Sequence, residues 1–420
     1  MVLGLTNHAC CCLDRLTYCR SNWAKGKPMQ LFLRLFHLGH VLVSGSLLCT
    51  LLATLVLPIA ASAQQPENST GKSAATDGSP QAWSLAEPRL AEGTPRWTVS
   101  IEAIGLGRSG GTDQTLVARV PGDVTFYGTA VVPGAEALNS NQFRRGFSAG
   151  PNISLTYHGN SGFGAELSYF NILNHSITQA IGPDSPADWL VMKAPGTFWQ
   201  TQDFPYQAMA WKSTTSLYNA EVNGRFDFSR RVAMLAGFRW IQLNDGLQGT
   251  LTAADITAPT WKRNCNCTLS QITPGDPAGS YPPFWNTSTM NNLYGVQIGV
   301  DTKMFEWGSL SLDGTIKSGI FDNVAEQSTG VSMQKKIYPS QAMTNHTAIV
   351  IEADLELKYQ VSRGLALKAG YKVLWLDGVA LAPGQIRETS TTPSSVRALG
   401  VNCASGVLFQ GATAGLEYSF

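Results

Sequence analysis

The sequence predicts an all-β protein: an up-and-down antiparallel transmembrane β-barrel of about ten strands, or twelve if a loop contains a further hairpin. Ten segments alternate apolar and polar residues, and each is longer than the roughly five or six residues of an average soluble strand. Short and long connections alternate between these segments. The last segment ends on an aromatic residue, Phe420, which is typical of the closing strand of an outer-membrane barrel.

Composition agrees with this fold class. The chain has 420 residues, of which 14% are charged, whereas an ordinary soluble domain has about 25%. It contains 41 glycines, its mean hydropathy is −0.04, and its net charge of +1 gives no basic footprint for nucleic acid. A soluble β-sandwich is the alternative, but the strand lengths favour the barrel, because a tilted strand needs about 9–11 residues to cross a bilayer.

The first 63 residues are predicted to be an N-terminal extension and a cleaved signal peptide, with Met29 as an alternative start. Arg34 supplies positive charge before the apolar run Val41–Ile59, and Ala61–Ala63 forms a small-residue cleavage site. A transmembrane anchor is the alternative, but the polar tract that follows favours cleavage.

Two ranges remain after the signal peptide. Residues 64–95 are rich in Ser, Thr, Gly, Pro, Glu and Ala and show no apolar periodicity, which predicts a disordered periplasmic linker. Residues 96–420 form the predicted barrel.

The first five strands are predicted from alternation and from the turns that separate them. The segment 97–107 places Trp97, Val99 and Ile101 on one face. The segments 145–158 and 163–173 flank a Gly-Asn-Ser-Gly turn, which is a strong hairpin signal. The segments 214–228 and 232–249 flank a Ser-Arg-Arg turn, and their apolar residues are Tyr218, Ala220, Val222, Phe226, Phe228, Val232, Met234, Ala236, Phe238 and Trp240.

The last five strands are predicted in the same way, over residues 291–304, 307–322, 346–361, 365–380 and 407–420. Their apolar faces begin with Tyr294, Leu310, Ile349, Leu365 and Ala412. Aromatic residues gather near both ends of the strands, as expected of girdles at the two membrane interfaces.

The connections predict the topology. Four of them are only about two to four residues long, as in the short periplasmic turns of an outer-membrane barrel. The other five are predicted to be long extracellular loops, over residues 108–144, 174–213, 250–290, 323–345 and 381–406. An even number of strands places both termini on the periplasmic side.

Four segments carry a resemblance to a known family. Gly162–Phe170, Leu235–Leu243, Asn291–Asp301 and Ile316–Ala325 resemble the seventh of the putative beta-barrel porin families of Gram-negative outer membranes. The resemblance covers most of residues 96–420. It implies a pore in the bacterial outer membrane and supplies no catalytic residues.

Charged residues on the polar faces of the strands are the candidate site. We predict that ten acidic and seven basic side chains face the lumen: Glu102, Glu166, Glu221, Asp227, Asp301, Asp313, Glu352, Asp354, Glu356, Glu417, Arg225, Arg239, Lys303, Lys317, Lys358, Lys368 and Lys372. They either line a polar pore or form an ion-paired core. Small barrels are filled by side chains, whereas open channels have about 16 strands or more.

One row of carboxylates allows a second interpretation. Glu352, Asp354 and Glu356 share a face and could bind a divalent cation. We favour pairing with Lys368 and Lys372 of the next strand, and so predict no metal site.

Three cysteines remain after the signal peptide. We predict a disulfide that ties Cys265 or Cys267, in the third long loop, to Cys403 in the fifth. The Cys-x-Cys spacing supplies too few ligands for the alternative, a metal site.

The sequence therefore predicts a passive or weakly selective porin for small solutes. The alternative is a closed barrel whose loops form a surface binding or adhesion platform. No nucleophile, base and orienting group converge in the sequence, so we expect no enzyme and no cofactor. The expected partners are outer-membrane lipid, small solutes and the barrel assembly machinery, which would read Tyr418 and Phe420 as an insertion signal.

Overall fold

The computed structural model describes residues 95–121, 125–126, 135–143, 146–184, 188–192, 206–253, 262–263, 284–333, 336–392 and 395–420. The predicted signal peptide and all but the last residue of the predicted linker lie outside these ranges, so both stay predictions. No helix within the described ranges is long and apolar enough to cross a membrane.

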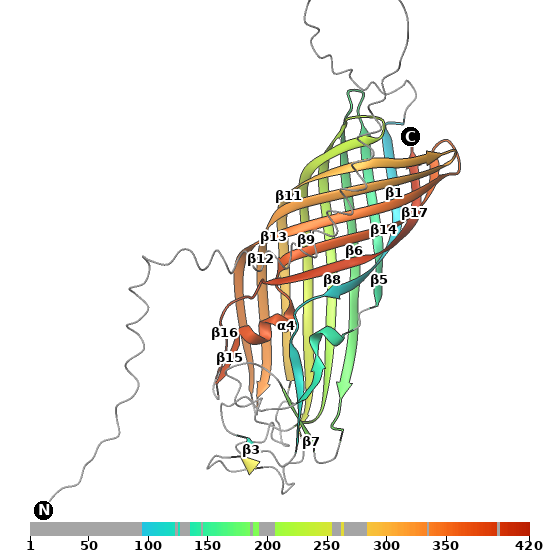
Figure 1. Cartoon of the computed structure of the whole chain (residues 1–420). Helices are drawn as coiled ribbons and strands as arrows, with labels where there is room; N and C mark the ends of the chain where they lie inside the picture. Colours follow the sequence, from blue (N-terminus) through green and yellow to red (C-terminus); the bar gives the residue numbers. More distant parts are fainter. Residues whose placement is uncertain are drawn as a thin grey trace, which may run out of the picture. The chain divides into compact units, whose positions relative to one another are not determined.

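Ten long strands form the barrel, which confirms the predicted fold class (Figure 1). They are β1 (Trp97–Gly110), β5 (Phe147–His158), β6 (Phe163–Ile181), β8 (Tyr206–Asp227), β9 (Val232–Ala253), β11 (Phe284–Trp307), β12 (Leu310–Met333), β13 (Lys336–Gln360), β14 (Leu365–Val379) and β17 (Ser405–Ser419).

Each barrel strand pairs with its neighbour in the chain, and the last strand pairs with the first. The ring order is β1, β5, β6, β8, β9, β11, β12, β13, β14 and β17, and every pair is antiparallel. At the closing seam Val99 lies opposite Tyr418, and the N–H groups of Arg96 and Trp97 each donate to the Phe420 carbonyl over 3.0 Å. Closure removes the unpaired edges that a bilayer does not tolerate.

The remaining elements lie in the connections. Three short strands, β2 (Thr115–Pro121), β4 (Ala135–Asn139) and β7 (Asp188–Met192), continue the sheet beyond β8. The others are β3 (Thr125–Phe126), η1 (Ser140–Gln142), β10 (Lys262–Arg263), α4 (Ala382–Gln385), η2 (Ile386–Glu388), β15 (Thr389–Thr392) and β16 (Ser395–Ala398). The alternative of twelve barrel strands is therefore wrong, because these short strands add no member to the ring.

The prediction of one of the five long loops is also wrong. Residues 323–345 are not a loop, since β12 continues to Met333 and β13 begins at Lys336. The two strands stay paired from Asn323↔His346 to Met333↔Lys336. Both faces of this hairpin are largely polar, so the apolar alternation that marks a strand in the sequence disappears although the strand continues.

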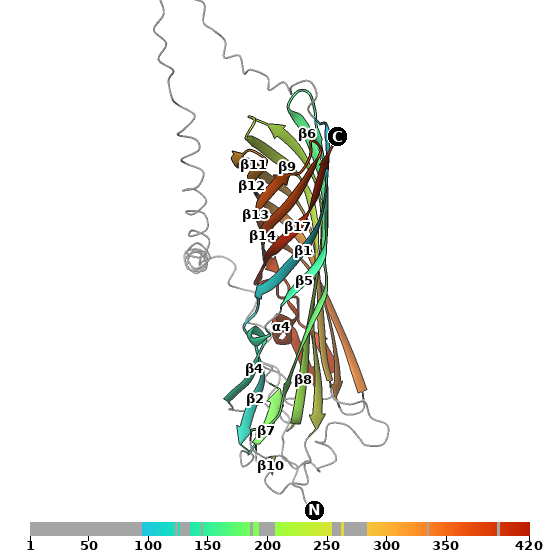
Figure 2. The ribbon, with the colours of Figure 1, turned by 90° about the vertical axis from the view of Figure 1, so that its right-hand side faces the viewer.

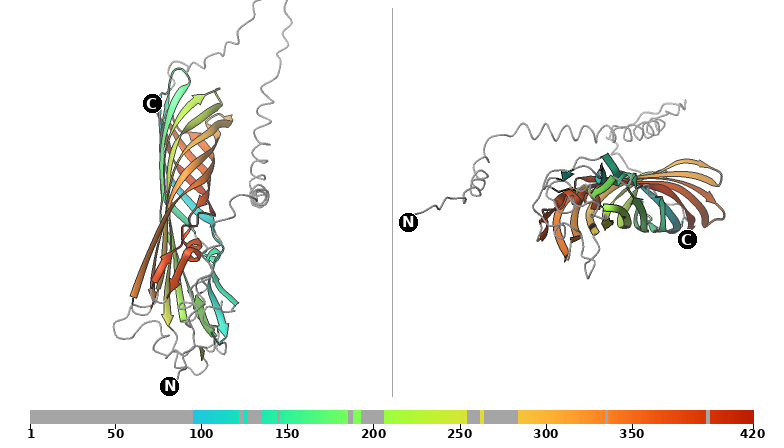
Figure 3. Two further views of the ribbon diagram at one scale, coloured as in Figure 1. Left: turned by 90° about the vertical axis from the view of Figure 1, so that its left-hand side faces the viewer. Right: turned by 90° about the horizontal axis from the view of Figure 1, so that it is seen from below.

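The barrel wall is not equally tall around the ring. β1, β5, β14 and β17 have 12 to 15 residues, whereas β8, β9, β11, β12 and β13 have 22 to 25. About 9–11 residues suffice to cross a bilayer. The loop-side halves of the five long strands therefore reach beyond the membrane, and we call this part the extension (Figures 2 and 3).

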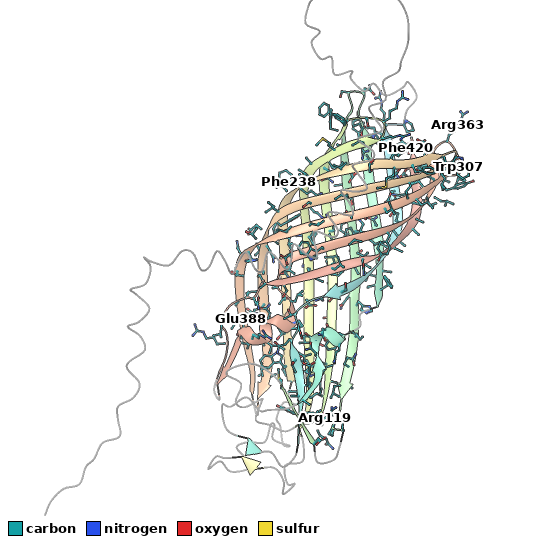
Figure 4. The ribbon with its side chains drawn as sticks, in the orientation of Figure 1. Arg119, Phe238, Trp307, Arg363, Glu388 and Phe420 are labelled. Carbon is teal, nitrogen blue, oxygen red and sulfur yellow. The ribbon has the colours of Figure 1, made fainter. Side chains whose placement is uncertain are left out.

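The outward side chains mark where the membrane ends. Nearer the turns, one row of directly paired, exposed residues crosses five strands and is wholly apolar: Val222, Phe238, Val296, Ile320 and Ile349. Further toward the loops no corresponding row is wholly apolar, and Ser, Thr, Asn and Gln become frequent. Phe238, Trp307 and Phe420 project outward in this apolar belt, whereas Arg119 and Glu388 lie at the loop end (Figure 4).

Closure of the ring depends on close approach at Gly411. A Cβ placed there would overlap the carbonyl oxygen of Gly105 on β1, whereas a Cβ at Gly105 would only reach the Ala412 oxygen at 4.0 Å. We predict that Gly411→Ala destabilises the folded barrel by about 1–3 kcal/mol, the usual cost of overpacking. Gly105→Ala, on the same seam, is the matched control.

The measurement is heat-modifiable migration on gels combined with urea unfolding in detergent. The folded, fast-migrating fraction should fall for Gly411→Ala and stay at the wild-type level for Gly105→Ala. Equal behaviour of the two variants would contradict the close-approach argument.

Candidate functional site

The candidate site is the interior of the barrel. Strand alternation turns one face of each strand inward, and most of the predicted lumen-facing side chains are buried or half-buried there: Glu102, Glu166, Glu221, Arg225, Asp227, Arg239, Asp301, Asp313, Lys317, Glu352, Asp354, Glu356, Lys358, Lys368, Lys372 and Glu417. Lys303 differs, because it is exposed at the turn end of β11, beside the register shift between Lys303 and Phe305.

Seven of these side chains form what we call the central ion cluster: Arg239, Lys317, Lys372, Glu166, Glu221, Glu352 and Asp354. Arg239 is paired with Glu352 and lies 3.9 Å from Glu221. Lys317 Nζ lies 2.6 Å from Glu221 and 3.0 Å from Glu166.

These pairs cross the lumen. Lys317 lies on β12 and Glu166 on β6, and β8, β9 and β11 stand between them in the ring. Lys372 on β14 lies 5.4 Å from the centre of the Phe170 ring on β6, which is also far around the barrel. Side chains from opposite walls therefore touch, and the interior at this level is filled.

The carboxylate row is neutralised by lysines of the next strand. Lys372 Nζ lies 3.0 Å from Glu352 and 2.9 Å from Asp354, and Lys368 Nζ lies 3.0 Å from Glu356. These are the ion pairs that the sequence favours over cation binding by the carboxylate row. Within the described ranges, no group of three or more His, Cys, Asp or Glu side chains is arranged to hold a metal ion.

A second cluster lies nearer the periplasmic turns. Lys358 Nζ lies 3.0 Å from both Asp313 and Glu417, and Lys368 is paired with Glu102 and lies 3.7 Å from Glu417. These contacts join β12, β13, β14, β17 and β1, so they also reach beyond neighbouring strands.

Arg225 holds a third group of charges at the same end of the barrel. Its guanidinium lies 2.9 Å from Asp227 and 2.6 Å from Asp301. His158 lies 3.7 Å from Asp227. Charges in a poorly solvated interior are tolerated when they are paired in this way.

An apolar layer lies on the loop side of the ions, and sequence reasoning missed it. No member is more than 3% exposed: Ile104, Leu106, Phe170, Ile172, Leu217, Ile241, Leu243, Leu293, Phe321, Ala348, Val350, Leu374, Leu376, Val379, Leu381, Val407 and Phe409. Nine barrel strands contribute to this layer. One sequence feature could have revealed this layer: the alternation is lost in segments such as Val373–Leu376, where both faces of the strand are apolar.

The connection after β14 turns into the barrel. All residues from Gly378 to Ile386 are buried, and we call them the plug segment. Gly378 starts it with a positive φ of 81°, and a Cβ there would meet the Thr347 carbonyl at 2.6 Å, so glycine is required. Figure 2 shows α4, which lies within this segment, at the height where β1 and β5 end.

Asparagines of β11 and β12 hold the plug segment. Asn291 accepts a hydrogen bond from the Ala380 N–H at 2.7 Å and donates to the Ala380 carbonyl at 2.8 Å, as a paired strand would. Asn323 donates to the Gly378 carbonyl at 3.0 Å. These contacts satisfy backbone groups that burial would otherwise leave without water.

Asp245 connects the plug segment to the barrel wall. One carboxylate oxygen accepts hydrogen bonds from Arg108 on β1 and Thr215 on β8, and the other accepts from the Ala382 N–H at 2.9 Å. The Arg108 and Asp245 side chains are only 4% and 0% exposed. A single buried carboxylate thus ties together three parts of the chain.

Cys403 does not form the predicted disulfide. It is a free, buried cysteine that packs with Ala325 and Ala380, because the chain around it folds into the barrel instead of lying on the surface. Cys265 and Cys267 lie outside the described residues. Burial raises the pKa of the Cys403 thiol to about 11.

The two terminal aromatic residues, Tyr418 and Phe420, lie on the outer side of the barrel. Tyr418 and Phe420 are exposed on the outer face of β17, with ring centroids 5.8 Å apart. Their role in insertion stays a prediction.

We predict that Arg239→Leu destabilises the barrel by about 3–5 kcal/mol, because it leaves the buried Glu352 short of a partner. Adding Glu352→Leu should recover most of this loss. In the double variant two ion pairs of the cluster remain: Lys372 with Asp354, 2.9 Å apart, and Lys317 with Glu221, 2.6 Å apart. Urea unfolding in lipid vesicles measures both effects.

The control for these variants is Lys303→Leu, which changes an exposed charge and should shift stability by no more than about 0.5 kcal/mol. An Arg239→Leu variant as stable as this control would show that the central ion cluster is solvated.

We predict that Cys403 in the folded barrel reacts slowly with iodoacetamide at pH 8. The raised pKa lowers the thiolate fraction about a hundredfold relative to an ordinary thiol. Unfolding without a reducing agent should restore full alkylation of Cys403, measured by peptide mass spectrometry. A thiol that stays unreactive until reduced would show a disulfide instead.

Comparison with known proteins identifies the family. Residues 207–420, half of the chain, match the family described as Putative beta barrel porin-7. No curated protein matches the sequence.

Several solved structures are similar to the chain at low identity. The outer membrane protease OmpT from Escherichia coli is 9% identical, with 80% of this chain and 100% of that chain covered and a TM-score of 0.43. A Pseudomonas aeruginosa FadL homologue is 11% identical, with 77% and 90% covered and a TM-score of 0.25. The Pseudomonas putida toluene transporter TodX is 10% identical, with 79% and 91% covered and a TM-score of 0.27.

Likeness at this level does not extend to activity or substrate. The match over residues 207–420 includes all of β9 to β17 and almost all of β8. With the closed barrel, this match locates the protein in the bacterial outer membrane. The chain belongs to the Putative beta barrel porin-7 family.

Proposed function

We propose that this protein is a closed outer-membrane barrel that works through its extension and loops, as a surface binding platform. It has no enzymatic role and needs no cofactor. The observation that carries the proposal is the filled interior, in which ion pairs, the apolar layer and the plug segment lie along the same path. The predicted passive porin is the weaker of the two predicted functions.

Ion passage would need a hydrated path through this interior. The members of the apolar layer are at most 3% exposed and offer no polar atom to replace the water around an ion. The asparagines in the same paired rows, Asn219, Asn291 and Asn323, are fully buried as well. The ion pairs nearer the turns would have to separate as well. Barrels of about eight strands are filled by side chains, whereas water-filled channels have about 16 or more, and ten strands lie nearer the filled end.

The extension supplies the surface for binding. Its strands continue well past the lipid belt, and β2, β4 and β7 widen its sheet next to β8. Outer-membrane lipid is the proposed partner of the apolar belt. The barrel assembly machinery is the proposed partner of β17, through Tyr418 and Phe420.

A gated passage for small solutes is the second candidate, favoured by one observation. From Ala380 on, the plug segment belongs to the connection between β14 and β17 and not to the barrel wall, so it can leave the interior without opening the ring. Family membership is also consistent with this candidate.

We predict that the refolded wild-type barrel is silent in planar bilayers across several lipid compositions. A variant in which residues 380–402 are replaced by a Gly-Ser linker should also stay silent, because the ion pairs and most of the apolar layer remain. Single-channel recording is the measurement, with an open general porin as the positive control.

The outcomes separate the two candidates. Conducting steps from the wild type would overturn the closed-barrel proposal. A silent wild type with a conducting linker variant would support the gated passage, with the plug segment as its gate.

A further inference from the structure

The outer face of the extension carries a groove with a volume of about 790 Å³. Its floor consists of two rows of directly paired residues that cross β8, β9, β11, β12 and β13. The row nearer the loops is Thr214, Gly246, Ser288, Ser328 and Gln341. The row nearer the membrane is Ser216, Asn244, Met290, Glu326 and Met343.

The groove opens on the outer side of the barrel wall, and Thr215, Asp245 and Thr289 of the inward-facing rows border it as well. Thr215, Asp245 and Thr289 alternate with the floor residues along their strands and turn inward, where Asp245 and Thr289 contact the plug segment. The floor residues therefore face away from the lumen. A ligand in the groove would approach from the side of the barrel, just beyond the lipid belt.

Small and already ordered side chains make the groove hollow. Gly246 has no side chain, and Ser216 is only 9% exposed although it faces outward. Asn244 Nδ2 donates to Ser216 Oγ over 3.2 Å, and Gln242 Nε2 donates to Asn244 Oδ1 over 3.3 Å. The polar groups are thus held in place before any ligand binds, which lowers the entropic cost of binding.

The residues that line the groove indicate the chemical class of its ligand. None of the described residues that line the groove is Lys or Arg, so it offers no cation for phosphate or another anion. Its outward groups are mainly hydroxyls and amides, with Glu326 as a carboxylate acceptor and the Tyr218 ring at the membrane side. Met290, Met343 and the Tyr218 ring add apolar surface beside these polar groups, which suits a ligand with both polar and apolar faces.

We propose that this groove binds a neutral saccharide chain. Hydroxyls and amides match the donors and acceptors of sugar hydroxyl groups, and the Tyr218 ring can stack on the C–H face of a sugar. Five strands at a spacing of about 4.8 Å give a floor about 19 Å across, long enough for several sugar units. The inference rests on the proposed function, because it names the ligand class of the platform.

The probes separate two sources of saccharide. Maltoheptaose and cellohexaose test a free neutral chain. Phosphatidylethanolamine vesicles with and without lipopolysaccharide test the sugar of an outer-leaflet glycolipid. Inorganic polyphosphate tests the anion-binding alternative. Binding to the full-length refolded barrel is measured by calorimetry for the soluble probes and by vesicle flotation for the glycolipid.

A matched pair of variants tests the position of the groove. Ser288→Trp fills the floor on β11, and Asn286→Trp places the same side chain on the same outward face, two residues away and outside the lining. We expect Ser288→Trp to weaken saccharide binding about tenfold or more and Asn286→Trp to leave it within about twofold. Heat-modifiable migration confirms that both variants fold.

Tyr218 gives a second test of the same site. Tyr218→Ala should weaken binding, whereas Tyr218→Phe keeps the ring and should retain most of the affinity. Binding of the free oligosaccharides or of the lipopolysaccharide vesicles alone supports the proposal and identifies the source.

Binding of polyphosphate in preference to all saccharide probes, equal effects of the two Trp variants, or no saccharide binding by the wild type would each overturn the inference. A barrel that conducts ions overturns the proposed function instead, so the two failures are distinguishable.

Discussion

The pairing of β1 with β17 is the constraint on which the rest of this structure depends. Inside a bilayer each backbone N–H and C=O group must find its partner within the protein, so the first and last strands have to meet. The seam achieves this from Trp97 at the turns to Gly110 on the loop side, and glycine at position 411 lets the two backbones approach. Once the ring is closed with ten members, its circumference is fixed.

That circumference determines what the interior can be. A ten-stranded ring is narrow enough for side chains of opposite walls to touch, as Lys317 and Glu166 do. Polar inward residues are then stable when they form ion pairs or hydrogen bonds, and apolar ones can pack as they would in a soluble core. The protein uses the two solutions at different heights. The three clusters of ion pairs lie where the outer wall meets lipid. The apolar layer and the plug segment, with the Arg108–Asp245 pair, lie toward the loops.

The sequence was sufficient to predict the ring of strands and its inward charged residues. It was not sufficient to predict the extension or the plug segment. The alternation from Ile349 to Tyr359 on β13 is visible in the sequence because one face of the strand contacts lipid and the other faces the polar interior. Past Ile320 on β12 the outer face meets water and is mostly polar. The inner face mixes polar residues with Phe321, Ala325 and Val331, so the strand has no periodic signal. The plug segment was missed for a related reason. Val379–Ala382 is apolar, but nothing in a single sequence shows that a connection turns inward.

The position of the plug segment also determines how the interior is filled. Most of it lies in the connection between β14 and β17, the last strand of the chain and a partner of β1. Two adjacent strands of the ring therefore hold the segment by both its ends, next to the loop end of the lumen. Its docking is an intramolecular step, favoured by the high effective concentration that such tethering gives. The lumen is filled by the chain itself, without a second molecule, at any protein concentration.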